Sequence, residues 1–217
     1  GFEKALGQKV NKFLIDDFDM TQKTIVLCVK PANVAEVSKK LQGKADLLIS
    51  VLAGVPVKTL KKHFKPKSVV RSMPNLAASI GKSMTTLTGD VKGKDEAMVI
   101  LNAVGATLWL ESEKEIDIAT ALAGSGPAYL ALIAEALADG AVKQGLGRDN
   151  AMAVMKGLFS GFSELIQETH PALLKDNVMS PGGTTAAGYA ALEEGNVRAS
   201  CIDAIEQAYE KAKALSV

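Results

Sequence analysis

Short apolar runs in the first half of the chain constrain its fold more than any other sequence feature. Residues 25–29 and 47–51 are apolar at nearly every position, with no alternation of polar and apolar side chains. Such runs indicate strands that are buried on both faces, which is typical of a parallel sheet between two layers of helices. A third strand is expected at 68–72, and weaker ones at 84–88 and 107–110.

The pattern changes from strand to helix near residue 111. Helices are expected between the strands, at 34–41, 56–62 and 94–104, whereas the second half shows helical patterns only, at 114–123, 128–143, 149–167, 184–194 and 197–215. The sequence therefore predicts an α/β domain with a doubly wound parallel sheet over residues 1–111, and an all-α domain over residues 112–217.

The helix predicted at 128–143 is apolar around nearly its whole circumference. A chain of 217 residues rarely buries an entire helix by itself. We therefore expect a second subunit to cover this helix.

Charge and composition exclude several classes of function. The chain has 25 Lys and Arg against 24 Asp and Glu, and aromatic residues make up 5%, which argues against nucleic acid or an anionic membrane as partner. The two cysteines and two histidines have no metal-ligand spacing, so no metal site is expected. Two unpaired cysteines fit a cytoplasmic protein. No uninterrupted apolar run reaches the ~18 residues that cross a bilayer.

The segment Ser180–Thr185 reads Ser-Pro-Gly-Gly-Thr-Thr and directly precedes an apolar helix. Glycines at a helix N-terminus leave backbone N–H groups open to a carboxylate or phosphate. On spacing alone, an ordinary turn with a Thr N-cap explains the segment equally well. Two other positions are interpreted structurally: Ser125 as a helix cap before Pro127, and His170 as a capping group rather than a catalytic one.

Two predicted strands end at Val29–Pro31 and Val51–Gly54. Because ligands of open α/β sheets bind at the carboxyl ends of the strands, a dinucleotide would lie over both segments. Lys30 is placed to meet a ribose or phosphate group, or else is an ordinary solvated lysine. Cys28 is expected to be a small core residue and not a thiolate.

Five motifs then occur in the order in which one enzyme family carries them: Val29–Pro31, Arg71–Asn75, Gly124–Tyr129, Lys175–Val178 and Ser180–Thr185. Together they resemble pyrroline-5-carboxylate reductase, the last enzyme of proline biosynthesis. The resemblance extends from about Thr24 to the C-terminus. Each motif alone is weakly specific, but the ordered set is specific, above all the loop at 171–179 that leads into Ser180.

The resemblance implies a Rossmann-type domain and a helical domain that interlocks with its twofold mate, in homodimers or rings of dimers. It places a small-molecule substrate at the subunit interface, near the nicotinamide of NADPH or NADH. Substrate contacts would fall on Asn177, Val178, Ser180, Gly182, Gly183, Thr184, Thr185 and Glu113. Cofactor contacts would fall on Cys28, Val29, Lys30, Pro31, Val51, Leu52 and Ala53.

The implied substrate is a five-membered cyclic imine that carries a carboxylate. Such an imine is largely protonated near neutral pH, so hydride transfer to C5 requires no strongly acidic side chain. Catalysis would then rest on orientation. The amides of Gly182–Thr184 would anchor the carboxylate, and the Thr185 hydroxyl, the expected catalytic group, would meet the ring nitrogen.

The chain departs from the family pattern at two places. No Gly-x-Gly-x-x-Gly precedes Thr24, so the Rossmann-type domain lacks its first β-α unit with the pyrophosphate loop. We therefore expect the 217-residue chain alone to bind a dinucleotide weakly or not at all, and to be inactive without that unit. In addition, Asn75-Leu76-Ala77 stands where the family usually has Asn-Thr-Pro.

Two alternatives remain open at this point. A related two-domain hydroxyacid dehydrogenase would need a lysine as general acid on the helix after the linker, but the helix from Ala128 has no lysine before Lys143. A non-enzymatic helical dimerisation module is supported only by the missing glycine-rich loop.

Overall fold

The computed structural model describes residues 9–215, which form two compact units. One unit comprises the chain up to Gly124 together with the C-terminal segment from Tyr209, and the other comprises Ser125–Ala208. The predicted change from strand to helix at 111–112 thus falls inside the first unit, because the first helix after it packs against the sheet.

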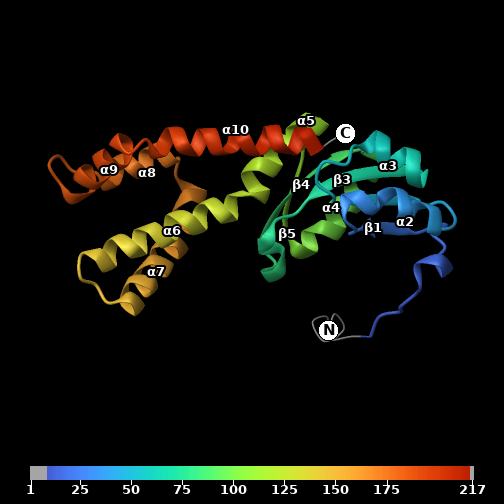
Figure 1. The fold of residues 1–217 in the computed structure, drawn as a ribbon, viewed down its shortest axis with the longest axis horizontal. Helices are drawn as coiled ribbons and strands as arrows, with labels where there is room; N and C mark the ends of the chain where they lie inside the picture. The colour runs from blue at the N-terminus through green and yellow to red at the C-terminus, as the bar shows by residue number, and fades with distance from the viewer. Residues whose placement is uncertain (1–8, 216–217) are drawn as a thin grey trace. The chain divides into compact units, whose positions relative to one another are not determined.

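The first unit contains a β-sheet (Figure 1). The sheet has five strands, which lie side by side in chain order. The strands are β1 (Thr24–Leu27), β2 (Leu47–Ser50), β3 (Ser68–Met73), β4 (Ser83–Gly89) and β5 (Gly105–Trp109). All five were expected from the sequence. The pairs β1–β2, β2–β3 and β4–β5 are parallel.

The expectation of a fully parallel sheet is wrong at one place, because β3 and β4 are antiparallel. The connection between them, residues 74–82, contains only the short helical turn Leu76–Ile80. Two parallel neighbours need a crossover of a dozen or more residues, so a connection this short reverses the chain direction.

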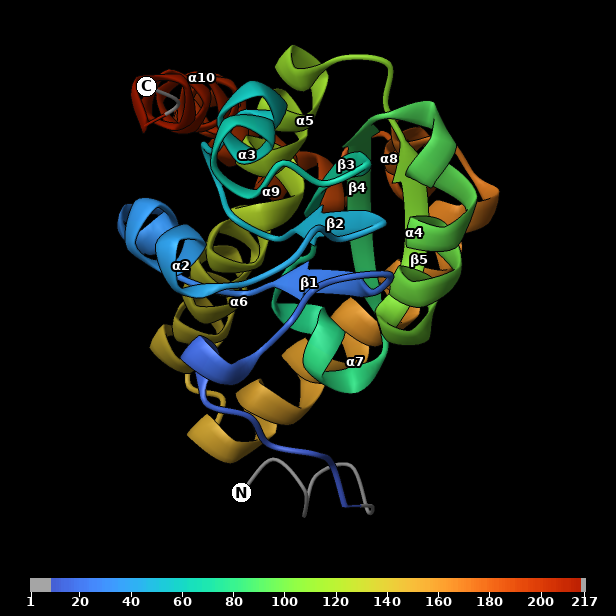
Figure 2. The same ribbon diagram turned by 90° about the vertical axis from the view of Figure 1, so that its right-hand side faces the viewer.

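Helices cover both faces of the sheet, as a doubly wound fold requires (Figure 2). Leu48 and Val69 join a core cluster with residues of α2 (Val34–Lys40) and α3 (Val57–Phe64). Leu47, Ile49 and Val70 face the opposite way and pack with α4 (Lys94–Leu101). All four residues of β2 are buried, which confirms burial on both faces for this strand.

The remaining elements are helical. They are α5 (Glu113–Ala119), the π-helical turn η6 (Thr120–Gly124), α6 (Gly126–Lys143), α7 (Arg148–Glu168), α8 (Pro171–Val178), α9 (Thr184–Glu194) and α10 (Val197–Leu215). Short 3₁₀ turns are η1 (Ile15–Asp17), η2 (Pro31–Asn33), η3 (Leu76–Ile80), η4 (Val91–Gly93) and η5 (Asn102–Val104). Between residue 112 and residue 215 the structure has no strand, as the sequence predicted.

Helix starts in the second half differ in part from the sequence expectations. The segment expected as a loop at 171–179 is mostly helix, because Pro171 suits the first helical position. His170 caps that helix, as predicted, and its ring nitrogen accepts the Ala172 N–H at 3.2 Å. The expected Ser125 cap is absent, since its side chain makes no capping hydrogen bond. At α9 the N-cap is Gly183 rather than a threonine.

Helix α6 exposes its apolar side chains in the single chain. Leu130, Leu132 and Leu137 are 55%, 66% and 45% exposed, and only Ala138 of this helix is buried. The helical stretch Glu113–Lys143 is long and apolar enough to cross a membrane by length and composition alone. The sequence observation that no uninterrupted apolar run reaches this length still holds, because Glu135 and Asp139 interrupt the apolar side chains of α6.

Candidate functional site

The carboxyl ends of β1 and β2 lie next to each other. In their parallel register Leu27 pairs with Ser50, and the Val51 N–H donates to the Leu27 carbonyl at 3.2 Å. The predicted cofactor residues that follow each strand, Cys28–Pro31 and Val51–Ala53, therefore occupy one end of the sheet. Their proximity is the geometry expected of a ligand site in an open α/β sheet.

Cys28 is exposed, so the expectation that it is a core residue is wrong. The reason is that, among residues 9–215, β1 pairs with β2 alone, which leaves the chain after β1 uncovered. Neighbouring groups still remove part of the water from the thiol and raise its pKa, so it is not a thiolate at neutral pH. Lys30, two residues further, is also exposed.

A groove of about 530 Å³ follows the outer side of β1. Its lining combines strand β1, the residues just after it, and apolar side chains from the preceding segment and from α2. Cys28 and Val29 belong to this lining, which consists of Phe13, Ile15, Phe18, Thr24, Ile25, Val26, Leu27, Cys28, Val29, Val37 and Leu41. Two predicted cofactor residues thus face an open groove.

The loop after β2 is held by hydrogen bonds from Ser50 and Ser72, both of which are buried. The Leu52 N–H donates to Ser50 Oγ at 3.3 Å, and Ser72 Oγ donates to the Ser50 carbonyl at 3.2 Å. Gly54 then turns the chain toward α3 with a φ of 70°, a conformation that favours glycine. This loop, residues 51–56, carries three of the predicted cofactor contacts.

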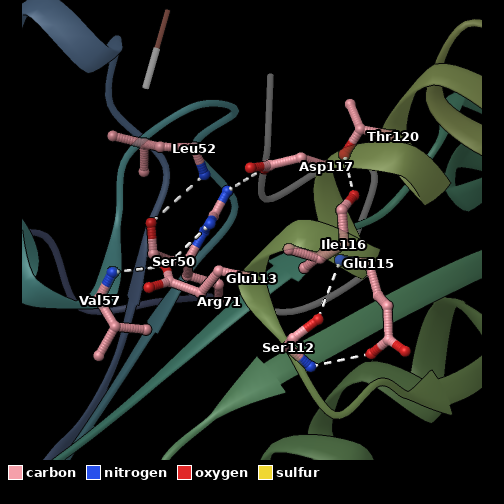
Figure 3. A network of polar contacts seen from close by, with 10 residues as sticks. All are labelled: Ser50, Leu52, Val57, Arg71, Ser112, Glu113, Glu115, Ile116, Asp117 and Thr120. Atoms are coloured by element: carbon pink, nitrogen blue, oxygen red, sulfur yellow. Dashed lines mark hydrogen bonds and ion pairs between the residues drawn. The ribbon is translucent and has the colours of Figure 1, made fainter. Parts of the chain in front are cut away.

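A buried arginine connects β3 to α5 (Figure 3). The Arg71 side chain is 5% exposed, and it donates to Glu113 Oε1 and to Asp117 Oδ1, both at 2.8 Å. The same Glu113 oxygen accepts the Val57 N–H at 2.8 Å. Glu113, a predicted substrate contact, thus uses one carboxylate oxygen for two donors within the first unit.

The first turn of α5 is fixed by a capping box, which holds Glu113 in place. Ser112 Oγ accepts the Glu115 N–H at 3.2 Å, and the Glu115 carboxylate accepts the Ser112 N–H at 2.9 Å. Sequence reasoning used Arg71 only as part of a motif and missed its ion pairs. The signal was available, since a lone charge inside a buried strand must find a partner.

In the second unit, the Ser180–Gly183 segment forms a tight turn. The Gly183 N–H donates to the Ser180 carbonyl at 3.0 Å, and Gly182 has a φ of 69°. Proline followed by a glycine with positive φ is typical of a type II turn. A Cβ at Gly183 would lie 2.4 Å from Ser180 Oγ, so a side chain there would require the Ser180 hydroxyl to rotate away.

Helix α9 begins directly after this turn. Its first N–H groups have no acceptor within the helix, so Thr184 and Thr185 present free backbone donors beside their hydroxyl groups. The turn and the end of α8 bring together all the predicted substrate residues except Glu113, which lies in the other unit. Most of them are exposed: Asn177, Val178, Ser180, Gly182, Thr184 and Thr185, with Gly183 half-buried.

Polar contacts hold α9 against its neighbours. The Lys175 ammonium of α8 lies 5.4 Å from the centre of the Tyr189 ring, and Arg198 of α10 donates to the Tyr189 hydroxyl at 2.6 Å. Glu193 bonds with both Arg198 and Tyr189, and these bonds lower the pKa of its carboxyl to about 2. The helix that carries the turn is therefore tied at its C-terminal end.

Within residues 9–215, no group of three or more His, Cys, Asp and Glu side chains is arranged to hold a metal ion. A doubly wound sheet followed by a helical unit is typical of dinucleotide-dependent oxidoreductases, which bind the cofactor at the carboxyl ends of the strands.

Comparisons with known proteins agree with this class. Residues 113–215 match the family model described as pyrroline-5-carboxylate reductase dimerisation. The pyrroline-5-carboxylate reductase of Synechocystis is 41% identical over 199 residues, which cover 88% of this chain and 74% of that protein. The pyrroline-5-carboxylate reductase of Pisum sativum is 36% identical over 209 residues, which cover 93% of this chain and 77% of that protein.

Solved structures give the same result. The Streptococcus pyogenes 1-pyrroline-5-carboxylate reductase has a TM-score of 0.84 at 31% identity, over 98% of this chain and 84% of that one. The Plasmodium falciparum pyrroline carboxylate reductase, solved with NADP bound, has a TM-score of 0.79 at 31% identity, over 89% and 77% of the two chains. This chain belongs to the pyrroline-5-carboxylate reductase family.

Proposed function

We propose that this protein reduces 1-pyrroline-5-carboxylate to L-proline with NADPH or NADH, the last step of proline biosynthesis. The observation that carries the proposal is the Ser180–Gly183 turn at the start of α9, inside the segment that matches the family. Relatives with this name cover most of the chain at 34–41% identity.

The residues at the ends of β1 and β2 fit a nicotinamide dinucleotide. Cys28–Pro31 and Val51–Ala53 lie at one end of the sheet, and the exposed Lys30 supplies a positive charge near a phosphate or ribose. When bound, the reduced nicotinamide supplies the hydride for C5 of the imine. The chain's own residues hold the dinucleotide through backbone groups of the two loops, because few polar side chains occur there.

The turn before α9 anchors the substrate carboxylate. The Gly183 amide already bonds the Ser180 carbonyl, so of the Gly182–Thr184 amides those of Gly182 and Thr184 are left for the carboxylate, with the Thr185 amide beside them at the positive end of the helix. Gly182 and Gly183 allow close approach because they carry no side chain. Asn177, Val178 and Ser180 line the same end of α8 and the turn.

The Thr185 hydroxyl accepts the N–H of the protonated imine, which orients C5 toward the nicotinamide. Loss of one hydrogen bond to a charged group, worth ~1.5–3 kcal/mol, lowers kcat/KM for Thr185→Ala by about tenfold to a hundredfold. Thr184→Ala is the matched control and costs less, because its backbone amide survives. The assay follows NADPH oxidation with 1-pyrroline-5-carboxylate, in a chain that carries a glycine-rich β-α unit before Thr24. A silent Thr185→Ala would refute the role of the hydroxyl.

Dinucleotide binding has its own test. Calorimetry with NADPH compares the 217-residue chain with a chain that carries a glycine-rich β-α unit before Thr24. We expect weak or no binding by the first and clear binding by the second, because the pyrophosphate contacts belong to that unit. Tight binding by the 217-residue chain would show that residues before Thr24 replace the loop.

The family match over residues 113–215 is to a dimerisation domain, and it includes the exposed leucines of α6. We place this helix in a homodimer interface, or in a ring of such dimers, in a cytoplasmic enzyme. Both cysteines, Cys28 and Cys201, are free, which suits a reducing compartment. Sedimentation at micromolar concentration tests the assembly, and a compact 22.7 kDa monomer would refute it.

A further inference from the structure

Arg71 is a buried cation, with a side chain that is 5% exposed. Its guanidinium lies between β3 and α5, and its two terminal nitrogens bond Glu113 and Asp117. Its Nε is buried and has no hydrogen-bond partner among the described residues. A buried charge of this kind fixes the geometry of the groups around it, because each of its bonds is costly to break.

One of its two acceptors reaches the loop that follows β2. Glu113 Oε1 accepts both Arg71 Nη1 and the backbone N–H of Val57, each at 2.8 Å (Figure 3). Val57 is the first residue of α3, and the N-cap, Pro56, makes no side-chain cap. Glu113 therefore takes the place of a capping side chain from 56 positions away in the sequence.

The loop between β2 and α3 is short and anchored at both ends. At the strand end, Ser50 Oγ accepts the Leu52 N–H. At the helix end, the start of α3 is held by Glu113, whose carboxylate is oriented by Arg71. The segment between these points contains Val51, Leu52 and Ala53, the proposed cofactor contacts.

We propose that Arg71 and Glu113 are positioning residues for the dinucleotide: Arg71 orients the Glu113 carboxylate, and Glu113 holds residues 51–56 in the shape that receives the cofactor. This assigns Glu113 a role different from the substrate contact that the family resemblance implies. The kinetic part of the test rests on the proposed function, whereas the amide-exchange part does not.

The variants are chosen to separate these roles. Glu113→Ala removes the acceptor of the Val57 N–H, and Glu113→Gln keeps an amide oxygen in its place. Asp117→Asn is the matched control, because it changes the other partner of the same guanidinium and leaves the Val57 bond intact. Arg71→Met removes the group that orients Glu113.

Hydrogen–deuterium exchange is measured on the 217-residue chain at Val57 and at residues 51–55. We expect exchange to rise about tenfold or more in Glu113→Ala and Arg71→Met, and to change less than about threefold in Glu113→Gln and Asp117→Asn. In a chain that carries the glycine-rich β-α unit, the KM for NADPH rises in Glu113→Ala and Arg71→Met, and Arg71→Met leaves kcat and the KM for 1-pyrroline-5-carboxylate within about twofold.

Two results would overturn the inference. Unchanged exchange at Val57 in Glu113→Ala would show that the bond does not hold the loop. The other result is a raised KM for 1-pyrroline-5-carboxylate in Glu113→Ala, with the KM for NADPH unchanged in that variant and in Arg71→Met. It would make Glu113 a direct substrate contact. If the proposed function alone were wrong, the exchange effects would remain in a protein without reductase activity.

Discussion

Replacing Arg71 by methionine should destabilise the sheet-containing unit strongly. The substitution keeps an apolar chain of similar reach but leaves Glu113 and Asp117 without their cation. Removing one partner of a buried ion pair costs ~3–5 kcal/mol. The carboxylates here are 40% and 15% exposed, so water relieves part of the penalty and the low end, about 3 kcal/mol, is expected.

The protein offers a specific probe for this measurement. Trp109 is the only tryptophan in the sequence, and it lies in β5 against the α4 side of the core. Its fluorescence during guanidinium or thermal unfolding therefore reports on the sheet-containing unit. A loss of about 3 kcal/mol in a chain of this size lowers Tm by about 6 to 12 °C.

A triple variant controls for simple loss of packing. Adding Glu113→Gln and Asp117→Asn to Arg71→Met removes the two unpaired charges, so it should recover a substantial part of the lost stability. Either of two results would refute the electrostatic explanation: a loss below about 1 kcal/mol in Arg71→Met, or a triple variant no more stable than the single one.

Three further predictions concern other parts of the chain. Gly105→Ala should lower the free energy of unfolding, measured by Trp109 fluorescence, by about 3 kcal/mol or more. Gly105 has a φ of 141°, and the alanine Cβ would lie 2.1 Å from the Ser83 carbonyl oxygen. A loss below about 1 kcal/mol would contradict this. His170→Ala should lower the unfolding free energy by about 1 kcal/mol through the lost cap and leave the pH profile of kcat unchanged, whereas abolished turnover with intact folding would make it a catalytic acid. In the folded protein the pKa of Glu193 is about 2, below the ordinary value of 4.5, so the ionised carboxylate stabilises the fold above pH 4.5 and this contribution is lost as the pH falls toward 2. The Tm difference between the protein and Glu193→Gln should therefore shrink from pH 4.5 to pH 2, and a difference independent of pH would contradict the assignment.

Local sequence patterns were sufficient for the secondary structure of most of the chain. The run 47–51 is apolar because β2 is buried on both faces, and this can be read without knowing its partners. Strand direction was harder, because it depends on the connection rather than on the strand. The short link at 74–82 is the sequence signal that indicates the antiparallel β4.

The exposure of Cys28 depends on the position of β1 in the sheet and not on the type of residue. Cys28 was expected in the core because small sulfur-containing side chains are usually buried. It is exposed because β1 pairs with only one strand among the described residues. No property of residues 24–29 distinguishes an edge strand from a central one, since the difference lies in which other segments pair with them.

The sequence by itself determined the order of strands and helices, the glycine-dependent turn at Ser180–Gly183 and the ordered motifs of the family, because these features depend on residues close together in the chain. Only the tertiary structure decided what Glu113 contacts. Its two donors, on Arg71 and Val57, are 42 and 56 positions away, and they meet it because β3, α3 and α5 fold against one another. Hydrogen bonds over such separations leave no local pattern, since each partner is selected by the packing of the whole unit.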